Sequence, residues 1–147
     1  MPLIDPYVIA AAIDVEVPAE TAFEFMADGM KQRHWALGST DRKALGDGVF
    51  SDTDALDGSD FYVKLESNRE LLMVDFLLGD SPDTLRPHVE ARIRPGSWIG
   101  LDGGDGSCVV TLTLWRWPEA DQDDWESHWH VWHTEVRLIK AAIERGL

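Results

Sequence analysis

A stripe of apolar side chains near the C-terminus is the feature that most constrains the fold of this chain. Its residues are spaced 4, 3, 4, 3 and 4 positions apart: Trp125, Trp129, Trp132, Val136, Ile139 and Ile143. This spacing places them on one side of an α-helix. Acidic residues from Asp121 onward precede the stripe, and basic residues up to Arg145 follow it, as the helix dipole favours. The pattern predicts one helix from about Asp121 to Arg145, packed by its tryptophans against a sheet.

The middle of the chain predicts that sheet. The segments with strand character are Val49–Thr53, Ser59–Ser67, Glu70–Leu78, His88–Leu101 with a bend near Pro95, and Cys108–Trp117. Short connections rich in Gly, Asp and Ser join them, so we expect neighbouring strands to be antiparallel. Several strands are apolar on both faces, as in Leu71–Leu78. One face must therefore be covered by something other than water.

The first part of the chain predicts one more strand and two short helices. Tyr7–Val17 alternates apolar and other residues, as a strand does. Pro18 ends this strand and can open a helix at Ala19–Ala27. A second short helix is expected at Met30–Leu37, before Gly38. The whole order of elements is typical of an α+β domain, and at 147 residues we expect a single domain over 1–147.

The segment from Ala12 to Met26 carries a resemblance to a known superfamily. Its sequence is AIDVEVPAETAFEFM, and Asp28 and Trp35 follow it. This stretch resembles the first strand and proline-opened helix of the START/polyketide-cyclase (SRPBCC) superfamily. The chain departs from the pattern at Gly29, where a proline is common. The resemblance implies the helix-grip fold: a curved antiparallel sheet wrapped around a long C-terminal helix, with two short helices after the first strand.

The resemblance also implies a ligand pocket between the sheet and the long helix. Similar families include polyketide cyclases and aromatases, lipid and hormone binders, and activators of chaperone ATPases. They share no catalytic signature, so no catalytic residue carries over to this chain. The residues expected to line the pocket are Trp35, Phe61, Val63, Met73, Asp75, Trp115, His128, Trp129 and Trp132.

Two of these residues are polar. His128 lies at the edge of the apolar stripe and could act as a hydrogen-bonding or acid–base group; the alternative is a histidine satisfied by a carbonyl or by water. Asp75 shares a strand face with Met73 and would have a raised pKa if that face is the concave one. If the face is convex, Asp75 is simply exposed. The sequence likewise does not decide which face of the sheet carries the side chains of Tyr62, Arg92 and Arg116.

Other constellations predict no further chemistry. Glu126, His130 and His133 share a flank of the C-terminal helix turned away from the tryptophans, and we expect no metal there. The glycine-rich turn after Asp102 lacks the lysine of a phosphate loop. Cys108 is expected to be a structural thiol. The sequence therefore predicts no metal and no cofactor.

The charge balance restricts the partners. The chain has 13 basic and 27 acidic residues, a formal net charge of −14. Nucleic acid and anionic membrane surfaces would repel it, so neither is an expected partner. The N-terminus has no basic region or apolar signal core, and the chain is expected to be cytoplasmic. The oligomeric state does not follow from the sequence.

Two functions remain as hypotheses. The leading one is binding of a small hydrophobic molecule, aromatic or polyketide-like, with cyclisation or dehydration by His128 or Asp75 as its enzymatic version. The alternative is a protein-interaction module similar to the chaperone-ATPase activators, without ligand chemistry. A large cavity would favour the first hypothesis. A core filled by its own tryptophans, with an apolar patch on the sheet, would favour the second.

Overall fold

One antiparallel sheet and one long helix dominate the computed structural model, which describes residues 3–55 and 57–147. The sheet has seven strands in the order β1-β7-β6-β5-β4-β3-β2. Their bounds are β1 Val8–Val15, β2 Lys43–Gly46, β3 Val49–Thr53, β4 Asp60–Asn68, β5 Met73–Gly79, β6 Arg86–Pro95 and β7 Cys108–Trp115. The helical elements are α1 Ala19–Met26, η1 Gly29–His34, η2 Gly96–Ile99, η3 Gly104–Gly106 and α2 Gln122–Glu144. The α+β class and the order of elements are confirmed.

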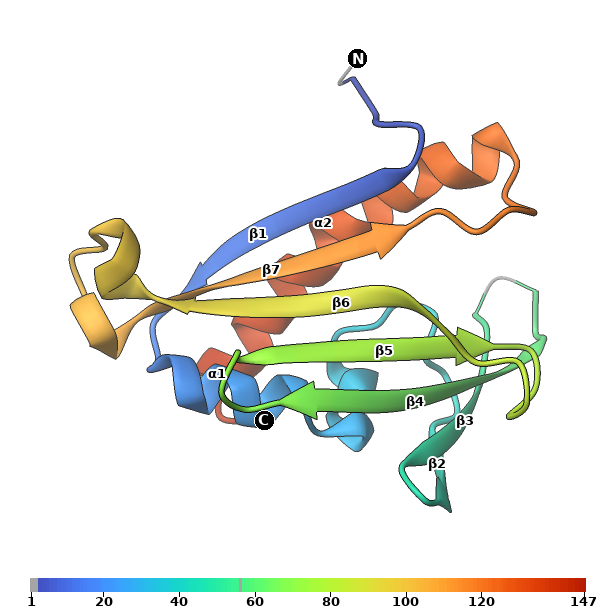
Figure 1. Cartoon of the computed structure of the whole chain (residues 1–147), viewed down its shortest axis with the longest axis horizontal. Coiled ribbons are helices and arrows are strands. Elements are labelled where there is room, and N and C mark those ends of the chain that lie inside the picture. The colour runs from blue at the N-terminus through green and yellow to red at the C-terminus, as the bar shows by residue number, and fades with distance from the viewer. Residues whose placement is uncertain (1–2, 56) are drawn as a thin grey trace.

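Helix α2 runs unbroken along the sheet, as the apolar stripe predicts. Figure 1 shows it passing behind β1 and β7. The Asp121 carboxylate begins the helix by accepting the Asp124 N–H at 2.8 Å. Trp125 and Trp132 are buried and donate their indole N–H groups to the carbonyl oxygens of Asp5 and Leu112, at 2.8 and 2.9 Å. Both tryptophans therefore bury their rings without leaving an unpaired donor.

The two faces of the sheet differ in what covers them. On β5, Val74 and Phe76 are fully buried in the core that α1 and α2 complete. Alternation along the strand turns Met73, Asp75 and Leu77 to the opposite face, where they are half-buried. We call the face that carries the core the concave face and the other the convex face.

Helices α1 and η1 cover the part of the concave face that α2 leaves free. The Trp35 ring, after η1, meets the Phe76 ring edge-on at 5.8 Å. Gly29 begins η1 against the Phe50 ring, and a Cβ added at Gly29 would lie 2.3 Å from a Phe50 ring carbon. The glycine that departs from the family pattern therefore leaves the space that the Phe50 ring occupies, and a side chain at this position would displace the ring.

Two expected bounds are wrong, and one strand was missed. The strand expected to reach Leu101 ends at Pro95, because the chain turns into η2 there. The short helix expected at Met30–Leu37 is a 3₁₀ helix that ends at His34. Strand β2 was not predicted, since its four residues are all exposed and show no apolar pattern. Within the part of the chain that is described, no helix has the length and apolar character needed to cross a membrane.

Candidate functional site

The loop between η1 and β2 connects helix α2 with strand β3. We call residues Ala36–Arg42 the bridging loop. One end of it is bonded to Glu135 on α2, and the other end to Asp52 on β3. Each of these carboxyl groups is buried, with 4% and 2% of its residue exposed. The bridging loop therefore spans the space between the long helix and the far strands.

Asp52 is held by a dense set of donors. It accepts hydrogen bonds from Ser39 Oγ, Thr40 N at 3.0 Å, Asp41 N at 2.8 Å, Arg42 Nε at 2.9 Å and Thr53 N at 2.8 Å. Burial by itself would raise the pKa of Asp52, but these hydrogen bonds outweigh it and hold the pKa below its ordinary value. Asp52 is therefore an ionised carboxylate inside the protein.

Glu135 has far fewer partners. Its carboxyl accepts one hydrogen bond, from the backbone N–H of Leu37 at 2.9 Å. Burial raises the pKa of Glu135 to about 8, and the Leu37 hydrogen bond lowers it only in part. At neutral pH Glu135 is mostly a protonated carboxylic acid, which can donate an O–H as well as accept.

An apolar side chain of the concave face, Phe61, lies opposite Asp52 on the neighbouring strand. Phe61 lies two residues before the fully buried Val63 on β4, and Leu78 pairs with Val63 across the strands. All three side chains therefore share the concave face. Phe61 and Leu78 are only half-buried, although both pack against the core. The concave face is thus closed at its centre and partly open around these two residues.

His128 and Glu135 share one flank of α2, two helical turns apart. The Nδ1 atom of His128 lies 2.8 Å from the Asp124 carbonyl oxygen. Its ring meets the Trp117 ring edge-on at 5.0 Å. The half-buried imidazole therefore has one nitrogen engaged with the helix backbone and its ring in contact with Trp117.

Trp129 lies on the other flank of α2. Its ring stacks on His133, with 4.0 Å between the ring centroids. On the same flank, Lys140 Nζ donates to the carbonyl oxygen of Asp14 at 2.7 Å. Asp14 belongs to β1, an edge strand of the sheet. This flank therefore faces the sheet edge, away from the bridging loop.

The structure divides the expected pocket residues into three groups. Trp35, Val63 and Trp132 are buried in the core on the concave side, where Phe61 is half-buried, and His128 is half-buried beside Trp117 on the flank of α2 that also carries Glu135. Trp129 is turned to the edge of the sheet. Met73, Asp75 and Trp115 lie on the convex face and do not border the space between sheet and helix. Their expected position is corrected here, because their neighbours Val74, Phe76 and Leu114 are the ones turned to the core.

Asp75 is nevertheless not simply exposed. It pairs across the strands with Glu66 on one side and Glu90 on the other. Burial, and then the charge of Glu66, raise the pKa of Asp75 above its ordinary value. A raised pKa of Asp75 was expected only if Asp75 lay on the concave face. On the convex face, half-burial beside the like charge of Glu66 raises it. Among the described residues, no group of three His, Cys, Asp or Glu side chains is arranged to hold a metal ion.

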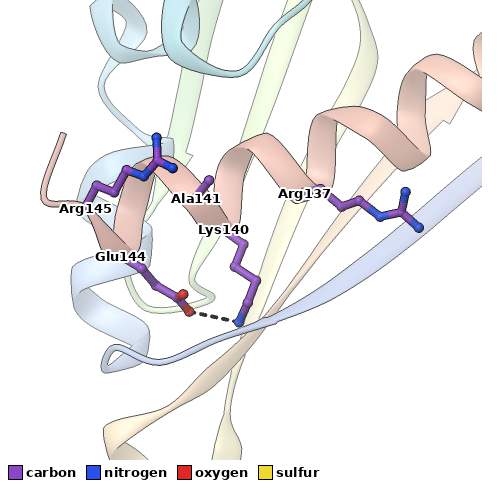
Figure 2. A pocket seen from close by; sticks show the side chains of 5 residues that line it. All are labelled: Arg137, Lys140, Ala141, Glu144 and Arg145. Atoms are coloured by element: carbon purple, nitrogen blue, oxygen red, sulfur yellow. Dashed lines mark hydrogen bonds and ion pairs between the residues drawn. The ribbon is translucent and has the colours of Figure 1, made fainter.

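Two surface concavities lie near the C-terminal end of α2. One, of about 320 Å³, is lined by Arg137, Lys140, Ala141, Glu144 and Arg145. Figure 2 shows Lys140 and Glu144 paired, at 2.9 Å, and the Arg137 and Arg145 side chains extending in different directions. The other, of about 220 Å³, lies between α1, Lys31 and the C-terminal residues. Neither concavity contains an expected pocket residue.

Comparison with known proteins identifies the fold. No protein-family model matches the chain, and no curated protein matches it in sequence. Solved structures match at low identity. A START superfamily protein from Mycobacterium smegmatis is 11% identical, over 96% of this chain and 99% of that chain, with a TM-score of 0.69. The fold is the helix-grip fold.

Two further solved structures with the helix-grip fold belong to proteins of different kinds. The Aha1 dimer from Colwellia psychrerythraea is 14% identical, over 95% of this chain and 97% of that chain, with a TM-score of 0.64. The di-domain ARO/CYC StfQ from the steffimycin biosynthetic pathway is 17% identical, over 94% of this chain and 45% of that chain, with a TM-score of 0.61. At such identities the likeness establishes the fold alone.

Sequence reasoning missed Glu135 and Arg42. Glu135 lies three residues after Trp132 and four before Ile139, which is the spacing of one helix face. A carboxyl at that spacing between two apolar residues was the signal for a buried acid. Arg42 gave no comparable signal, because its partner Asp52 lies on a strand whose pairing could not be inferred from the sequence.

Proposed function

We propose that this protein binds a small hydrophobic molecule between the concave face of the sheet and the flank of α2 that carries His128 and Glu135. The observation that supports this most directly is the incomplete burial of Phe61 and Leu78. Both side chains pack against the core, yet neither is fully covered by the protein. A flat apolar ligand seated on them would complete the burial of this face.

The polar groups around these residues suit such a ligand. Small-molecule sites are mainly apolar, with a few polar groups that orient the ligand. Glu135, protonated at neutral pH because burial raises its pKa to about 8, can offer a hydrogen bond without a net charge. His128 offers its second ring nitrogen from the same flank. Trp35, Val63 and Trp132 would form the floor of the site.

An enzymatic form of the proposal is the cyclisation or dehydration of a polyketide-like substrate. These reactions need proton transfer at a carbonyl or hydroxyl group, and a carboxylic acid with a pKa near the working pH suits that task. Glu135 and His128 are the groups of this flank that could carry the proton. The StfQ structure, named as an ARO/CYC, supports this form only through its fold.

A protein-interaction role is the second candidate. It is favoured by the filling of the core, since Trp35, Trp125 and Trp132 are 2%, 0% and 6% exposed. A closed core leaves less room for a ligand. The Aha1 structure has the same fold. In this case the surface of the sheet, and not its concave side, would carry the function.

A pair of substitutions on β5 tests the binding proposal. The measurement is titration with a panel of flat aromatic and fatty molecules, followed by tryptophan fluorescence and melting temperature. We expect the parent protein to bind at least one of them with micromolar affinity, around −8 kcal/mol. Leu78→Trp fills the proposed site and should abolish this binding.

Leu77→Trp is the matched control, because Leu77 is the neighbouring residue and lies on the convex face. It should leave the affinity unchanged. If no member of the panel binds the parent, the binding proposal fails and the interaction role takes its place. If Leu77→Trp removes binding as fully as Leu78→Trp does, the ligand lies elsewhere than on the concave face.

A further inference from the structure

The side chain of Arg42 is buried almost completely, with 1% of it exposed. Its Nε atom donates to Asp52 Oδ2 at 2.9 Å. Its Nη1 atom donates to the carbonyl oxygen of Gly29 and to Gln32 Oε1, both at 2.9 Å. The guanidinium also lies over the Phe50 ring, 5.6 Å from its centroid. These contacts fix the group between η1 and β3.

The remaining nitrogen of Arg42 has no partner. Nη2 is buried and makes no hydrogen bond to any of the described residues. An arginine facing a carboxylate commonly forms two parallel hydrogen bonds, from Nε and Nη2. Here the second bond is not made, since Asp52 Oδ1 already accepts the backbone N–H groups of Thr40, Asp41 and Thr53. The two N–H groups of Nη2 are therefore buried without an acceptor among the described residues, which costs free energy and calls for an explanation.

The position of this donor connects it with the proposed ligand site. Phe50 and Asp52 lie on the concave face, because they pair across the strands with Val63 and Phe61. Phe61 is the half-buried residue on which the proposed ligand rests. The guanidinium is bonded to Asp52, the cross-strand neighbour of Phe61, so the group that carries the unpaired nitrogen lies beside the strand next to that of Phe61.

The charge around Arg42 restricts what can use the donor. Asp52 is ionised and already neutralises the guanidinium. The protein as a whole carries a formal charge of −14, which disfavours entry of an anion. A neutral oxygen with free lone pairs, as in a ketone or an aldehyde, satisfies Nη2 without adding charge to a buried site.

We propose that Arg42 is a specificity-determining residue that selects apolar ligands bearing a carbonyl oxygen. This inference rests on the proposed function and adds the chemical class of the ligand. Arg42 acts as a hydrogen-bond donor in binding, and its ion pair with Asp52 holds the guanidinium in place. Hydrocarbons of the same shape leave Nη2 unpaired and bind more weakly.

Two nearly isosteric probes test the inference: 2-acetylnaphthalene, which has the carbonyl oxygen, and 2-ethylnaphthalene, which lacks it. We expect the parent protein to bind the ketone about tenfold or more tightly than the hydrocarbon, as a hydrogen bond to a charged group implies. Arg42→Lys keeps the charge beside Asp52 but has no Nη2. It should bring the ratio of the two affinities close to one, because only the ketone has an oxygen that can accept from Nη2.

Several results would overturn the inference and leave the proposed function intact. These are equal binding of both probes by the parent, an unchanged ratio in Arg42→Lys, or tighter binding of 2-naphthoate than of the ketone. If Arg42→Lys does not fold, NMR of the parent labelled with ¹⁵N-arginine decides. The Arg42 Nη signals must shift with the ketone and not with the hydrocarbon. If neither probe binds the parent while another member of the panel does, the inference fails and the proposed function stands. If no member of the panel binds, the proposed function itself fails.

Discussion

Asp52 and Glu135 are both buried carboxyl groups bonded to the bridging loop, and they differ in charge. Asp52 is surrounded by hydrogen-bond donors that include the guanidinium of Arg42, and these keep its pKa below the ordinary value. Glu135 has one backbone donor, and burial raises its pKa to about 8. The comparison teaches that burial does not by itself decide whether a carboxyl is ionised. The number and charge of its donors decide it.

The difference gives the bridging loop two unlike ends. At the Asp52 end, the bonds are made to an ionised group that stays ionised at neutral pH. At the Glu135 end, the single bond from Leu37 is made to an acid that loses its proton near pH 8. Because the Glu135 end borders the flank proposed for ligand binding, we expect pH to act on that end first.

Removal of the Asp52 carboxylate should have the largest effect. Asp52→Ala leaves Arg42 as a buried, unpaired charge and orphans the backbone donors of the loop. We expect the free energy of unfolding to fall by about 3–5 kcal/mol, as is usual when one partner of a buried ion pair is removed. Urea denaturation at pH 7 measures this.

The control for Asp52 is an exposed acid of the same loop. The carboxylate of Asp41 is exposed and pairs with Lys43, at 3.1 Å. Asp41→Ala should change the free energy of unfolding by less than about 0.5 kcal/mol. If Asp52→Ala proves as mild as Asp41→Ala, Asp52 does not hold the loop.

Replacing Glu135 by glutamine should raise the free energy of unfolding at pH 7, which is the opposite of the effect of Asp52→Ala. Glutamine keeps the size and the acceptor for the Leu37 N–H but has no proton to lose. The folded-state pKa of Glu135, about 8, lies above its ordinary value of 4.5, so the folded state holds the proton more tightly. Stability is then greatest below about pH 4.5 and falls as the pH rises toward 8. At about 1.4 kcal/mol per tenfold change in proton affinity, the loss at pH 7 is about 3 kcal/mol.

We therefore expect Glu135→Gln to stabilise the protein at pH 7 and to flatten the fall in stability between pH 5 and 8. Denaturation curves at a series of pH values, for the parent and the variant, measure both effects. Identical pH profiles would mean that Glu135 does not titrate within this range. A destabilised variant at every pH would mean that the carboxyl makes contacts that an amide cannot replace.

The fold was predictable from the sequence because its strongest signals are periodic. The spacing of Trp125, Trp132 and Ile139 predicts α2, and the confirmed helix Gln122–Glu144 lies within two residues of the expected bounds. Strand β3 was predicted with its bounds as observed. Irregular backbone was less predictable. The end of β6 at Pro95 and the exposed β2 depend on turns and pairings that leave no periodic pattern.

The candidate site was only partly predictable, because it depends on which sheet face is concave. Strand β5 is apolar on both faces, so the choice between Met73 with Asp75 and Val74 with Phe76 could not be made from the pattern. The structure makes that choice through packing against α1 and Trp35. Arg42 and Asp52, ten residues apart, meet because the β2–β3 hairpin pairs Lys43 with Ser51, which places the residues next to them opposite each other.

The smallest expected effect belongs to Asp75, which extends the comparison to the convex face. Like Glu135, Asp75 has a raised pKa, from burial first and from Glu66 second. Unlike Glu135, it is half-exposed, and water screens much of its interaction with Glu66 and Glu90. Asp75→Asn removes one of three like charges in a cross-strand row. We expect it to stabilise the protein by no more than about 0.5 kcal/mol at pH 7. The affinity for any ligand of the concave face should stay unchanged, and isothermal titration of the variant measures this. A loss of binding in Asp75→Asn, with folding intact, would return the ligand to the convex face and break the distinction between the two faces on which the proposed site depends.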